Sequence, residues 1–541
     1  MLKTDRSDGV LRALYVTCLA GLANAVLIGL INLAAEAVAS GERVEARLFV
    51  LYLIAFAIYA LANQASLRRA NDFLQERLGE LRLRLADKIR RAELRTLEGL
   101  GRGRLYAVVA QETNQLSQTF PLLVAASQSL FLLVFCLLYI AYLSPISFLV
   151  IGIVTALALL YYFHQRQALN AAMISVHAQE GEMLESLMHF TAGFQEIRLN
   201  ADKNDALFAR YTGIVDDLRA LIVGIGDKWV SLLLFSNAFL YGLLGIVIFV
   251  LPGFFSGYTD IIYKIAAAAI FCVGPVTAVT SAAPLFTKAS IGLGHVYRLE
   301  ELLDQGGLPP PARQATPSRF GGFASISFDA IGFTYRDPAR ESGFSTGPWS
   351  LELHRGEQLY LLGGNGSGKS TALKLMSGLY PVDTGAIRVD GVAVTADTLQ
   401  EYRELFSCIF PDFHLFDRLH GLDDVDPERV RELIARMELA DKVSYAAGRF
   451  STQDLSSGQR KRLAMIVALL EDREIYFFDE WAADQDAHFR AAFYTEILPE
   501  LKRRGKTVVV VTHDDRFWHL CDRAVTLDLG QMVAPEGGGR A

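Results

Sequence analysis

Six apolar stretches within the first 300 residues constrain the fold of this chain more than any other feature. Each is about 20 residues or longer, the length that spans a lipid bilayer as an α-helix. The 541-residue chain is 52% hydrophobic and only 21% charged, which is too apolar for an ordinary soluble enzyme. We therefore predict six transmembrane helices, near residues 11–37, 47–66, 120–143, 146–165, 229–252 and 261–286.

Basic residues indicate on which side of the membrane each connection lies. Two connections are long, residues 67–119 and 166–228, and both carry many lysines and arginines. Because such an excess near helix ends marks the cytoplasmic side, we place both connections and the N-terminus inside. The polar N-terminus lacks a convincing cleavage site, which favours an uncleaved first membrane helix over a signal peptide. The three short connections are then expected outside, at residues 40–43, 144–145 and 252–260.

The two long connections are predicted to be helical rather than loose. Residues 70–98 place apolar side chains at helical spacing among alternating charges, and no proline interrupts them. The second membrane helix is expected to continue into the cytoplasm for about 25 residues, or roughly 40 Å. Residues 166–227 are interpreted as paired helical extensions with a break near 191–193. Residues 98–106 and 193–198 are the expected turns. A free coiled coil is the alternative, but membrane helices bound both stretches.

A proline-rich segment separates this membrane part from a second domain. Residues 308–317 contain four prolines, which disfavour both helix and sheet. We predict a transmembrane domain at 1–300, a linker at 301–319 and a soluble α/β domain at 320–541. Within the last domain, apolar runs predict strands near 326–335, 386–390, 475–478 and 507–511.

The α/β domain contains a glycine-rich motif at residues 363–371, Gly-Gly-Asn-Gly-Ser-Gly-Lys-Ser-Thr. It lies between an apolar run at 358–362 and a helix-forming run at 372–376, which is the pattern of a phosphate-binding P-loop. Glycines let backbone N–H groups surround an anion, and the helix N-terminus adds partial positive charge. Lys369 is expected to reach the terminal phosphates and Ser370 to hold Mg²⁺. A chance glycine-rich turn would not carry the complete pattern with both flanks. The predicted nucleotide-binding residues are Gly363, Asn365, Gly366, Ser367, Gly368, Lys369, Ser370 and Thr371.

Two carboxylates end the predicted strand at 475–478. Asp479 is expected beside the metal ion, and Glu480 is placed to polarise the water that attacks the γ-phosphate. Strands ending in Asp-Glu are common, so the pattern gains its weight from the P-loop upstream. Together the two motifs predict Mg²⁺-dependent nucleotide hydrolysis.

The sequence Leu-Ser-Ser-Gly-Gln at residues 455–459 precedes a helical run at 460–470. In an arbitrary protein it would be a helix cap. At about 20 residues before Asp479-Glu480 it resembles the signature of the ABC transporter ATPase family. That family binds ATP between two nucleotide domains, so that the P-loop of one faces the signature serine of the other. The resemblance implies that Ser456, Ser457, Gly458 and Gln459 contact ATP held by a second copy of the chain.

The resemblance also implies roles for residues outside these motifs. Tyr335 matches the aromatic residue that stacks on adenine, His513 the switch histidine that contacts the γ-phosphate, and Asp486 the D-loop aspartate. The alternatives are a core aromatic for Tyr335 and a core histidine for His513. The resemblance covers essentially the whole chain and implies a half-size exporter. Its fold would be six transmembrane helices with long cytoplasmic extensions, fused to an α/β P-loop ATPase that binds ATP and Mg²⁺.

The chain departs from the family pattern at three places. Pro411 occupies the position of a glutamine that normally touches Mg²⁺ and signals to the membrane helices, so Asp412 or a water is the candidate substitute. The segment between Phe413 and the signature is shorter than is usual in the family. Residues 480–486 read Glu-Trp-Ala-Ala-Asp-Gln-Asp, where Pro-Thr-Ser-Ala-Leu-Asp usually follows the glutamate. Together these features resemble the bacterial subfamily that exports cyclic peptides and siderophore precursors, the pyoverdine and syringomycin type.

We therefore predict ATP-driven export of a peptide-like or siderophore-type substrate across a bacterial inner membrane. The expected partners are a second copy of the chain, membrane lipid and the substrate. A lipid flippase and a non-transporting regulatory ATPase are the alternatives, whereas importers usually keep these parts on separate chains. The net charge of −7 argues against nucleic-acid binding, and the five scattered cysteines indicate reduced thiols. Polar residues within the spans serve helix packing as readily as substrate contact; they include Asn24, Asn32, Asn63, Gln64, Gln128, Ser236, Asn237 and Thr277.

Overall fold

The structure, a computed structural model, falls into two compact units. One unit comprises Met1–Asp87 and Arg102–Glu301, and the other comprises Lys88–Gly101 and Leu302–Ala541. The described residues are 4–39, 43–250, 262–305, 319–335 and 344–533. The centre of the predicted linker, residues 306–318, lies outside them, as do residues 40–42 and 252–260 of two predicted outer connections and residues 251 and 261 of the adjoining predicted spans.

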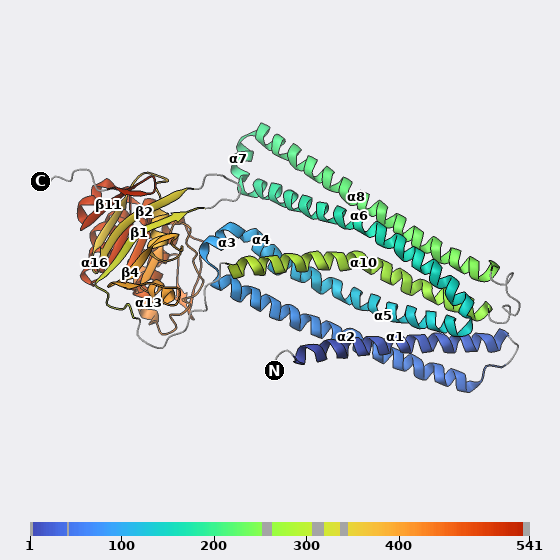
Figure 1. The fold of residues 1–541 in the computed structure, drawn as a ribbon. Coiled ribbons are helices and arrows are strands. Elements are labelled where there is room, and N and C mark those ends of the chain that lie inside the picture. Colours follow the sequence, from blue (N-terminus) through green and yellow to red (C-terminus); the bar gives the residue numbers. More distant parts are fainter. Residues whose placement is uncertain (1–3, 40–42, 251–261, 306–318, 336–343, 534–541) are drawn as a thin grey trace. The chain divides into compact units, whose positions relative to one another are not determined.

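Long helices build the first unit (Figure 1). Five of the six predicted apolar stretches fall within a long helix as far as the described residues extend, and the stretch at 229–252 runs from the end of a long helix into a short π-helix. Short elements join or extend them: the α-helices α4 (Arg102–Tyr106) and α7 (Phe194–Leu199), and the π-helices η1 (Ala107–Glu112) and η2 (Ile246–Val250). The long helices are α1 (Thr4–Ala39), α2 (Ala46–Arg91), α5 (Thr113–Leu143), α6 (Pro145–Ala192), α8 (Ala201–Gly245) and α10 (Ile262–Gln305).

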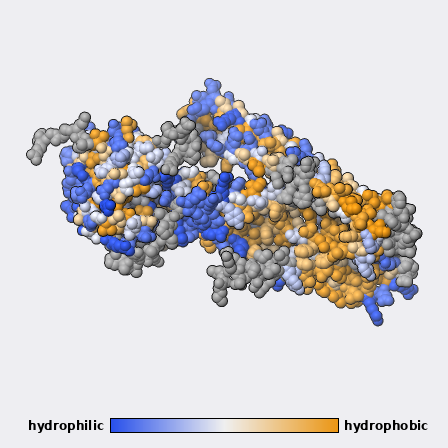
Figure 2. All heavy atoms as spheres, viewed as in Figure 1, coloured by the Kyte–Doolittle hydropathy of each residue, from blue (hydrophilic) through white to orange (hydrophobic). Residues whose placement is uncertain are grey.

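Length and composition make five helical runs among the described residues suitable for crossing a membrane. The predicted span at 146–165 is represented by a shorter apolar segment, Pro145–Val154, inside α6. Large hydrophobic side chains on α2, such as Phe49, Ile54 and Leu61, are exposed in the protein. Figure 2 shows hydrophobic residues gathered over α1 and the first part of α2, as a lipid-facing surface requires. The five runs are Thr17–Val38, Ala46–Arg91, Ala107–Leu143, Ala201–Val250 and Ile270–Gln305.

The extensions of the membrane helices are continuous, as the sequence predicts. Helix α2 runs unbroken for 46 residues, and α6 and α8 lie side by side (Figure 1). The predicted break between them falls at Gly193, after which α7 and Asn200 lead into α8. Asn200 caps α8 by accepting a hydrogen bond from the Lys203 amide at 3.0 Å. The predicted turn at 98–106 is instead largely helical, because α4 and the end of another short helix occupy it on either side of Gly101.

A six-stranded sheet forms the centre of the second unit. Its order is β12-β11-β3-β10-β9-β6, and every neighbouring pair is parallel except β11 and β12. Strands β3, β9 and β10 are buried along their whole length, as continuous apolar runs in a covered parallel sheet require. The strands are β3 (Gln358–Leu362), β6 (Phe406–Ile409), β9 (Ile475–Asp479), β10 (Thr507–Val511), β11 (Arg523–Asp528) and β12 (Gln531–Val533).

An antiparallel sheet of order β2-β1-β4-β5 accompanies the central one. It consists of β1 (Ser325–Thr334), β2 (Ser345–His354), β4 (Thr384–Val389) and β5 (Val392–Ala393). The predicted strand and turn near 386–390 are confirmed, since β4 leads through Asp390 and Gly391, both with positive φ, into β5. A two-residue hairpin pairs β7 (Tyr445–Ala446) with β8 (Arg449–Phe450).

Alternate residues of the central strands enter two hydrophobic cores. Phe478 and Val510 face one core, which also receives α13 and α14, whereas Phe477 and Val509 face the other, which receives α11 and the antiparallel sheet. Helix α3 belongs to this second unit, and its Leu94 packs on the second core. The helices of the unit are α3 (Leu94–Leu100), α11 (Lys369–Met376), α12 (Leu399–Arg403), α13 (Pro427–Arg436), α14 (Ser457–Glu471), α15 (Ala487–Ala492) and α16 (Leu498–Arg503), with η4 (Trp481–Asp484), η5 (Phe493–Ile497) and η6 (Asp515–Leu520).

Candidate nucleotide-hydrolysis site

The predicted site residues meet where the parallel strands end. Register pairs Val511 of β10 with Leu361 of β3 on one side and with Asp479 of β9 on the other. The P-loop follows β3, Glu480 follows β9, and His513 follows β10. Because the carboxyl edge of a parallel sheet is where such folds bind ligands, the topology brings these motifs to one place.

The P-loop has the backbone that its glycines were predicted to supply. Gly363 has φ of 140° and Gly368 has φ of 101°, values that L side chains rarely adopt. A Cβ atom at position 363 would also lie 2.2 Å from the Leu527 carbonyl oxygen, so only glycine fits. Helix α11 begins at Lys369 directly after the loop. Around it, Asn365, Gly366 and Ser370 are exposed, whereas Ser367 and Thr371 are buried.

The Lys369 side chain folds back onto the P-loop, which it follows in the chain. Its Nζ donates hydrogen bonds to the carbonyl oxygens of Gly363 at 2.9 Å and Gly364 at 2.8 Å. Burial lowers the pKa of Lys369, and the nearby carboxylates of Glu480 and Asp479 oppose this shift. A partly desolvated ammonium group held by carbonyl oxygens is available to a phosphate that offers stronger acceptors.

Asp479 is the least solvated carboxylate of the site. Its side chain is 1% exposed, and neither carboxylate oxygen accepts a hydrogen bond of ordinary geometry from the described residues. Burial raises the pKa of Asp479, and the Ser370 side chain opposes the rise. A buried carboxylate without partners is costly, and oxygen ligands are what Mg²⁺ prefers. Asp479 and Ser370 therefore fit a divalent cation.

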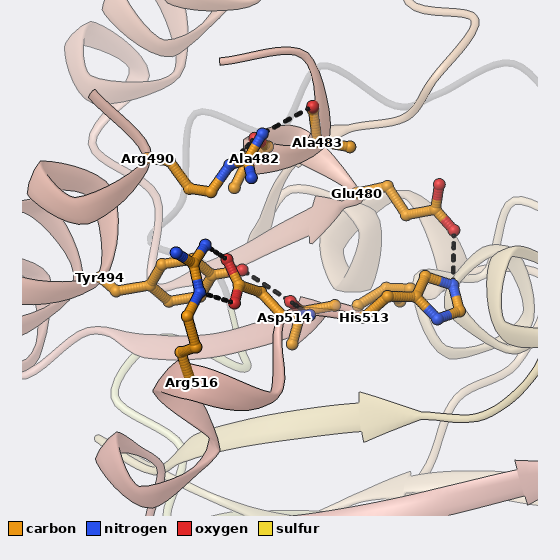
Figure 3. Close-up of a pocket in the computed structure, with 10 residues that line it drawn as sticks. Glu480, Ala482, Ala483, Arg490, Tyr494, His513, Asp514 and Arg516 are labelled. Atoms are coloured by element: carbon orange, nitrogen blue, oxygen red, sulfur yellow. Dashed lines mark hydrogen bonds and ion pairs between the residues drawn. The ribbon is translucent and has the colours of Figure 1, made fainter. Parts of the chain in front are cut away.

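Glu480 and His513, the two predicted catalytic residues, lie next to each other at the open side of the site. His513 Nε2 lies 3.2 Å from Glu480 Oε1, and Figure 3 shows the two side chains directed toward each other from neighbouring strand ends. Glu480 has left-handed backbone angles, φ 49° and ψ 36°, which are uncommon for a residue with a side chain. The pair borders a cavity of about 370 Å³ that Arg490, Tyr494 and Arg516 also line. Glu480 is thus half-exposed, where it can reach a water.

The signature sequence begins helix α14 and caps it. The Ser456 hydroxyl accepts a hydrogen bond from the Gln459 amide, and Gln459 Oε1 accepts one from the Ser456 amide, which is a capping box. The helix therefore starts at Ser457, three residues before the predicted run. Ser456 and Ser457 are exposed, and no hydrogen bond between described residues joins them to the P-loop. Gly458 packs closely, since a Cβ there would lie 2.7 Å from the Asp484 carbonyl oxygen.

Tyr335 follows β1 and reaches the P-loop helix. Its hydroxyl lies 3.4 Å from Thr371 Oγ1 and 3.0 Å from the Tyr380 hydroxyl, while its ring meets the Phe333 ring edge-on. Tyr335 therefore packs as a strand aromatic beside the P-loop helix, and its stacking on adenine stays a prediction. Sequence reasoning missed Phe344, whose Cζ atom lies 3.3 Å from the position of a Cβ at Gly368.

Asp486 is engaged within its own chain. Its carboxylate caps α15 by accepting the Phe489 amide at 2.8 Å, and it forms an ion pair with Arg462 of α14. The Phe489 amide and Arg462 hold the pKa of Asp486 below its usual value. Its predicted contact with nucleotide has no counterpart within a single chain and stays a prediction.

Sequence reasoning also missed a buried link between the signature helix and Glu480. Lys461 of α14 is only 6% exposed, and its Nζ donates to the Glu480 carbonyl oxygen at 2.8 Å and pairs with Asp484 at 2.8 Å. In return, Trp481 Nε1 donates to the Lys461 carbonyl oxygen at 2.9 Å. The sequence shows only that Asp484 stands where the family usually has alanine, which does not identify Lys461 as its partner.

Comparison with known proteins identifies the family. A family model described as ABC transporter matches residues 347–483. The curated protein "ATP-binding protein SyrD" of Pseudomonas syringae pv. syringae is 30% identical over 551 residues, which cover 96% of this chain and 94% of SyrD. The chain belongs to the ABC transporter family. The macrolide export ATP-binding/permease protein MacB of Salmonella typhi is 31% identical over 201 residues, but these cover only 34% of the chain and 30% of MacB.

The fold of this ABC transporter is that of an exporter. A solved structure of a bacterial Atm1-family ABC exporter with ATP bound matches 97% of the chain and 95% of its own, with a TM-score of 0.77 at 17% identity. The predicted fold class is confirmed, with apolar helices fused to an ABC ATPase domain. The protein is a bacterial membrane protein that couples ATP hydrolysis to export.

Lys461→Met in the ABC transporter tests the link to Glu480. The substitution keeps the apolar stem but removes the hydrogen bond to Glu480 and the ion pair to Asp484. We expect ATPase turnover to fall by about tenfold, the equivalent of one lost hydrogen bond to a charged group, with ATP binding unchanged. Steady-state kinetics and equilibrium nucleotide binding would measure both. Lys442→Met, the same replacement at an exposed position, is the control. Normal turnover in Lys461→Met would show that the link does not position Glu480.

Position 411 of the ABC transporter lies in an exposed turn just after β6. Proline offers no side-chain oxygen there, and the Asp412 carboxylate is exposed. If Asp412 replaces the missing glutamine, Asp412→Ala should lower Mg²⁺-dependent hydrolysis by about tenfold, as loss of an outer ligand partner does, and ATP binding much less. Hydrolysis rates across a Mg²⁺ titration would measure the effect, with Asp424→Ala as the control. Unchanged kinetics would remove Asp412 from the mechanism.

Proposed function

We propose that two copies of this chain export a peptide-like or siderophore-type substrate across the bacterial inner membrane. We infer the dimer from the signature sequence, residues 455–459, which lies at the start of α14. Ser456 and Ser457 are exposed, and within the described part of the chain the Ser456 hydroxyl bonds only to its own helix, so both are available to a nucleotide bound by a second copy. The substrate class rests on the departures at Pro411 and at residues 480–486, which resemble the peptide-exporting subfamily.

We propose a role for each residue of the site in this cycle. The P-loop amides and Lys369 bind the phosphates of ATP, and Tyr335 stacks on adenine. Asp479 and Ser370 hold Mg²⁺, which supplies positive charge to the transferring phosphoryl group when bound. Glu480 accepts a proton from the attacking water, while His513 contacts the γ-phosphate and orients the Glu480 carboxylate beside it.

ATP binding would clamp two nucleotide domains together, and the long cytoplasmic extensions would carry this closure to the membrane helices. Hydrolysis would then reset the pair. In this proposal residues 1–300 form the transmembrane domain, 301–319 the linker and 320–541 the nucleotide-binding domain. The N-terminus and the nucleotide domain lie in the cytoplasm, as the basic residues of the two long connections indicate.

Transport by the purified full-length chain in sealed vesicles tests the proposal. Cyclic peptides and siderophore precursors are the substrates to screen, and phospholipid is the competing substrate. We expect ATP-dependent movement of a peptide and stimulation of the ATPase by that peptide. Stimulation and movement of lipid alone would indicate a flippase. ATP hydrolysis without movement of either would indicate a regulatory ATPase.

A further inference from the structure

Helix α3 brings two charged side chains to the adenine side of the site. It follows α2 in the chain and belongs to the same compact unit as the P-loop. Arg95 and Glu98 are three residues apart, so both lie on one face of the helix. Leu94 beside them packs on the hydrophobic core that contains Tyr380, which anchors this face.

Arg95 holds the backbone just before Tyr335. Its Nη2 donates to the carbonyl oxygen of Thr334, the last residue of β1, at 3.1 Å. Its guanidinium lies 5.0 Å from the centre of the Phe333 ring. Arg95 of α3 therefore holds the backbone at the end of β1, directly before Tyr335.

Glu98 reaches the Tyr335 side chain through one intermediate residue. The Glu98 carboxylate accepts a short hydrogen bond from the Tyr380 hydroxyl and a second from Lys374 Nζ at 2.9 Å. Tyr380 is 1% exposed, and its hydroxyl accepts from the Tyr335 hydroxyl at 3.0 Å. An ionised carboxylate can only accept hydrogen bonds, so the Tyr380 hydroxyl donates its proton to the bond with Glu98. Tyr380 can then only accept from Tyr335, and the direction of both hydrogen bonds is fixed.

The aromatic rings reinforce this chain of hydrogen bonds. The Phe333 and Tyr380 rings stack with centres 4.9 Å apart and an interplanar angle of 13°, and the Tyr335 ring meets Tyr380 edge-on at 5.8 Å. Buried hydrogen-bond networks that are fully satisfied hold side chains in one arrangement. The Tyr335 ring is thus held at the edge of the site by groups that α3 supplies.

We propose that Glu98 is a positioning residue for the adenine-binding aromatic Tyr335, acting through Tyr380. This route does not involve position 411, where proline replaces the usual glutamine. The inference rests on the proposed function, in which Tyr335 stacks on the base of ATP.

Comparing a ligand that contains adenine with one that lacks it distinguishes positioning of Tyr335 from general support of the P-loop. In the full-length chain, Glu98→Gln should raise the KM for MgATP by about three- to tenfold, the equivalent of one net hydrogen bond, with kcat nearly unchanged. The inhibition constant of Mg-tripolyphosphate, which lacks adenine, should stay as in the wild type. Glu432→Gln, an exposed glutamate paired with Arg429, is the matched control.

Tyr380→Phe and Tyr335→Phe complete the test. Tyr380→Phe removes the intermediate hydroxyl and should reproduce the effect of Glu98→Gln even if the latter folds poorly. Tyr335→Phe keeps the ring, and its effect should not add to that of Glu98→Gln. Equal weakening of MgATP and Mg-tripolyphosphate, additive effects, or no change in either ligand would overturn the proposal. Failure of peptide transport with these nucleotide effects intact would instead overturn the proposed substrate.

Discussion

Glu480→Gln is expected to bind ATP as the wild type does and to lose its turnover by about a hundred- to ten-thousandfold, the range that a general base supplies. The amide keeps the size of the side chain and an oxygen for the contact with His513, which lies 3.2 Å away. It cannot take up the proton of the attacking water. ATP should therefore accumulate unhydrolysed between two copies of the chain.

Two measurements on Glu480→Gln check this expectation together. Phosphate release gives the turnover, and distances between spin labels on the two nucleotide domains, measured with MgATP, report whether the domains close. Glu496→Gln, at an exposed position of η5, should behave as the wild type. Near-normal hydrolysis by Glu480→Gln would remove Glu480 as the base, and tight ATP binding without domain closure would contradict the shared site.

Asp479→Asn is expected to change activity and stability in different directions. Hydrolysis should fall by at least about a hundredfold, because the amide is a poor ligand for Mg²⁺. The nucleotide-free protein should be no less stable, and its free energy of unfolding should rise by up to about 2 kcal/mol, since a buried carboxylate without hydrogen-bond partners is replaced by a neutral group. Loss of the favourable charge beside Lys369 limits that gain.

Thermal melting with and without MgATP distinguishes these effects for Asp479→Asn. The wild type should be stabilised by MgATP more than by ATP with a chelator, whereas the variant should show the same melting temperature in both. A lower melting temperature of the nucleotide-free variant would mean that Asp479 has partners in the folded chain. Mg²⁺-dependent stabilisation that survives the substitution would move the metal to other ligands.

Local motifs were predictable from the sequence because short stretches determine them. The apolar run before Gly363 and the helix former after Lys369 define β3, the P-loop and α11 without reference to the rest of the chain. The fully buried strands β9 and β10 followed from uninterrupted apolar residues, and their shared edge brings Asp479 and His513 together.

The contacts that support the site were not predictable because they join distant parts of the chain. The sequence alone predicts Lys461 to be an ordinary exposed charge on a helix. Only the packing of α14 shows that its side chain is buried against the Glu480 carbonyl oxygen. The glycines in residues 98–106 indicated a turn, whereas α3 forms a helix there and is stabilised by packing on the second core. Nothing in the spacing of Glu98 and Tyr380, 282 residues apart, indicated that they bond.

The membership of Lys88–Gly101 in the nucleotide-binding unit bears on how the ATPase should be prepared in isolation. A fragment cut at the proline-rich segment would begin after residue 318 and would lack α3. The Phe333 ring would lose the Arg95 guanidinium, and Tyr380 and Lys374 would lose their shared carboxylate. Leu94 would no longer cover its part of the core. Because we propose that Tyr335 stacks on adenine, such a fragment should bind nucleotide more weakly, and supplying residues 88–101 as a separate peptide should restore the affinity.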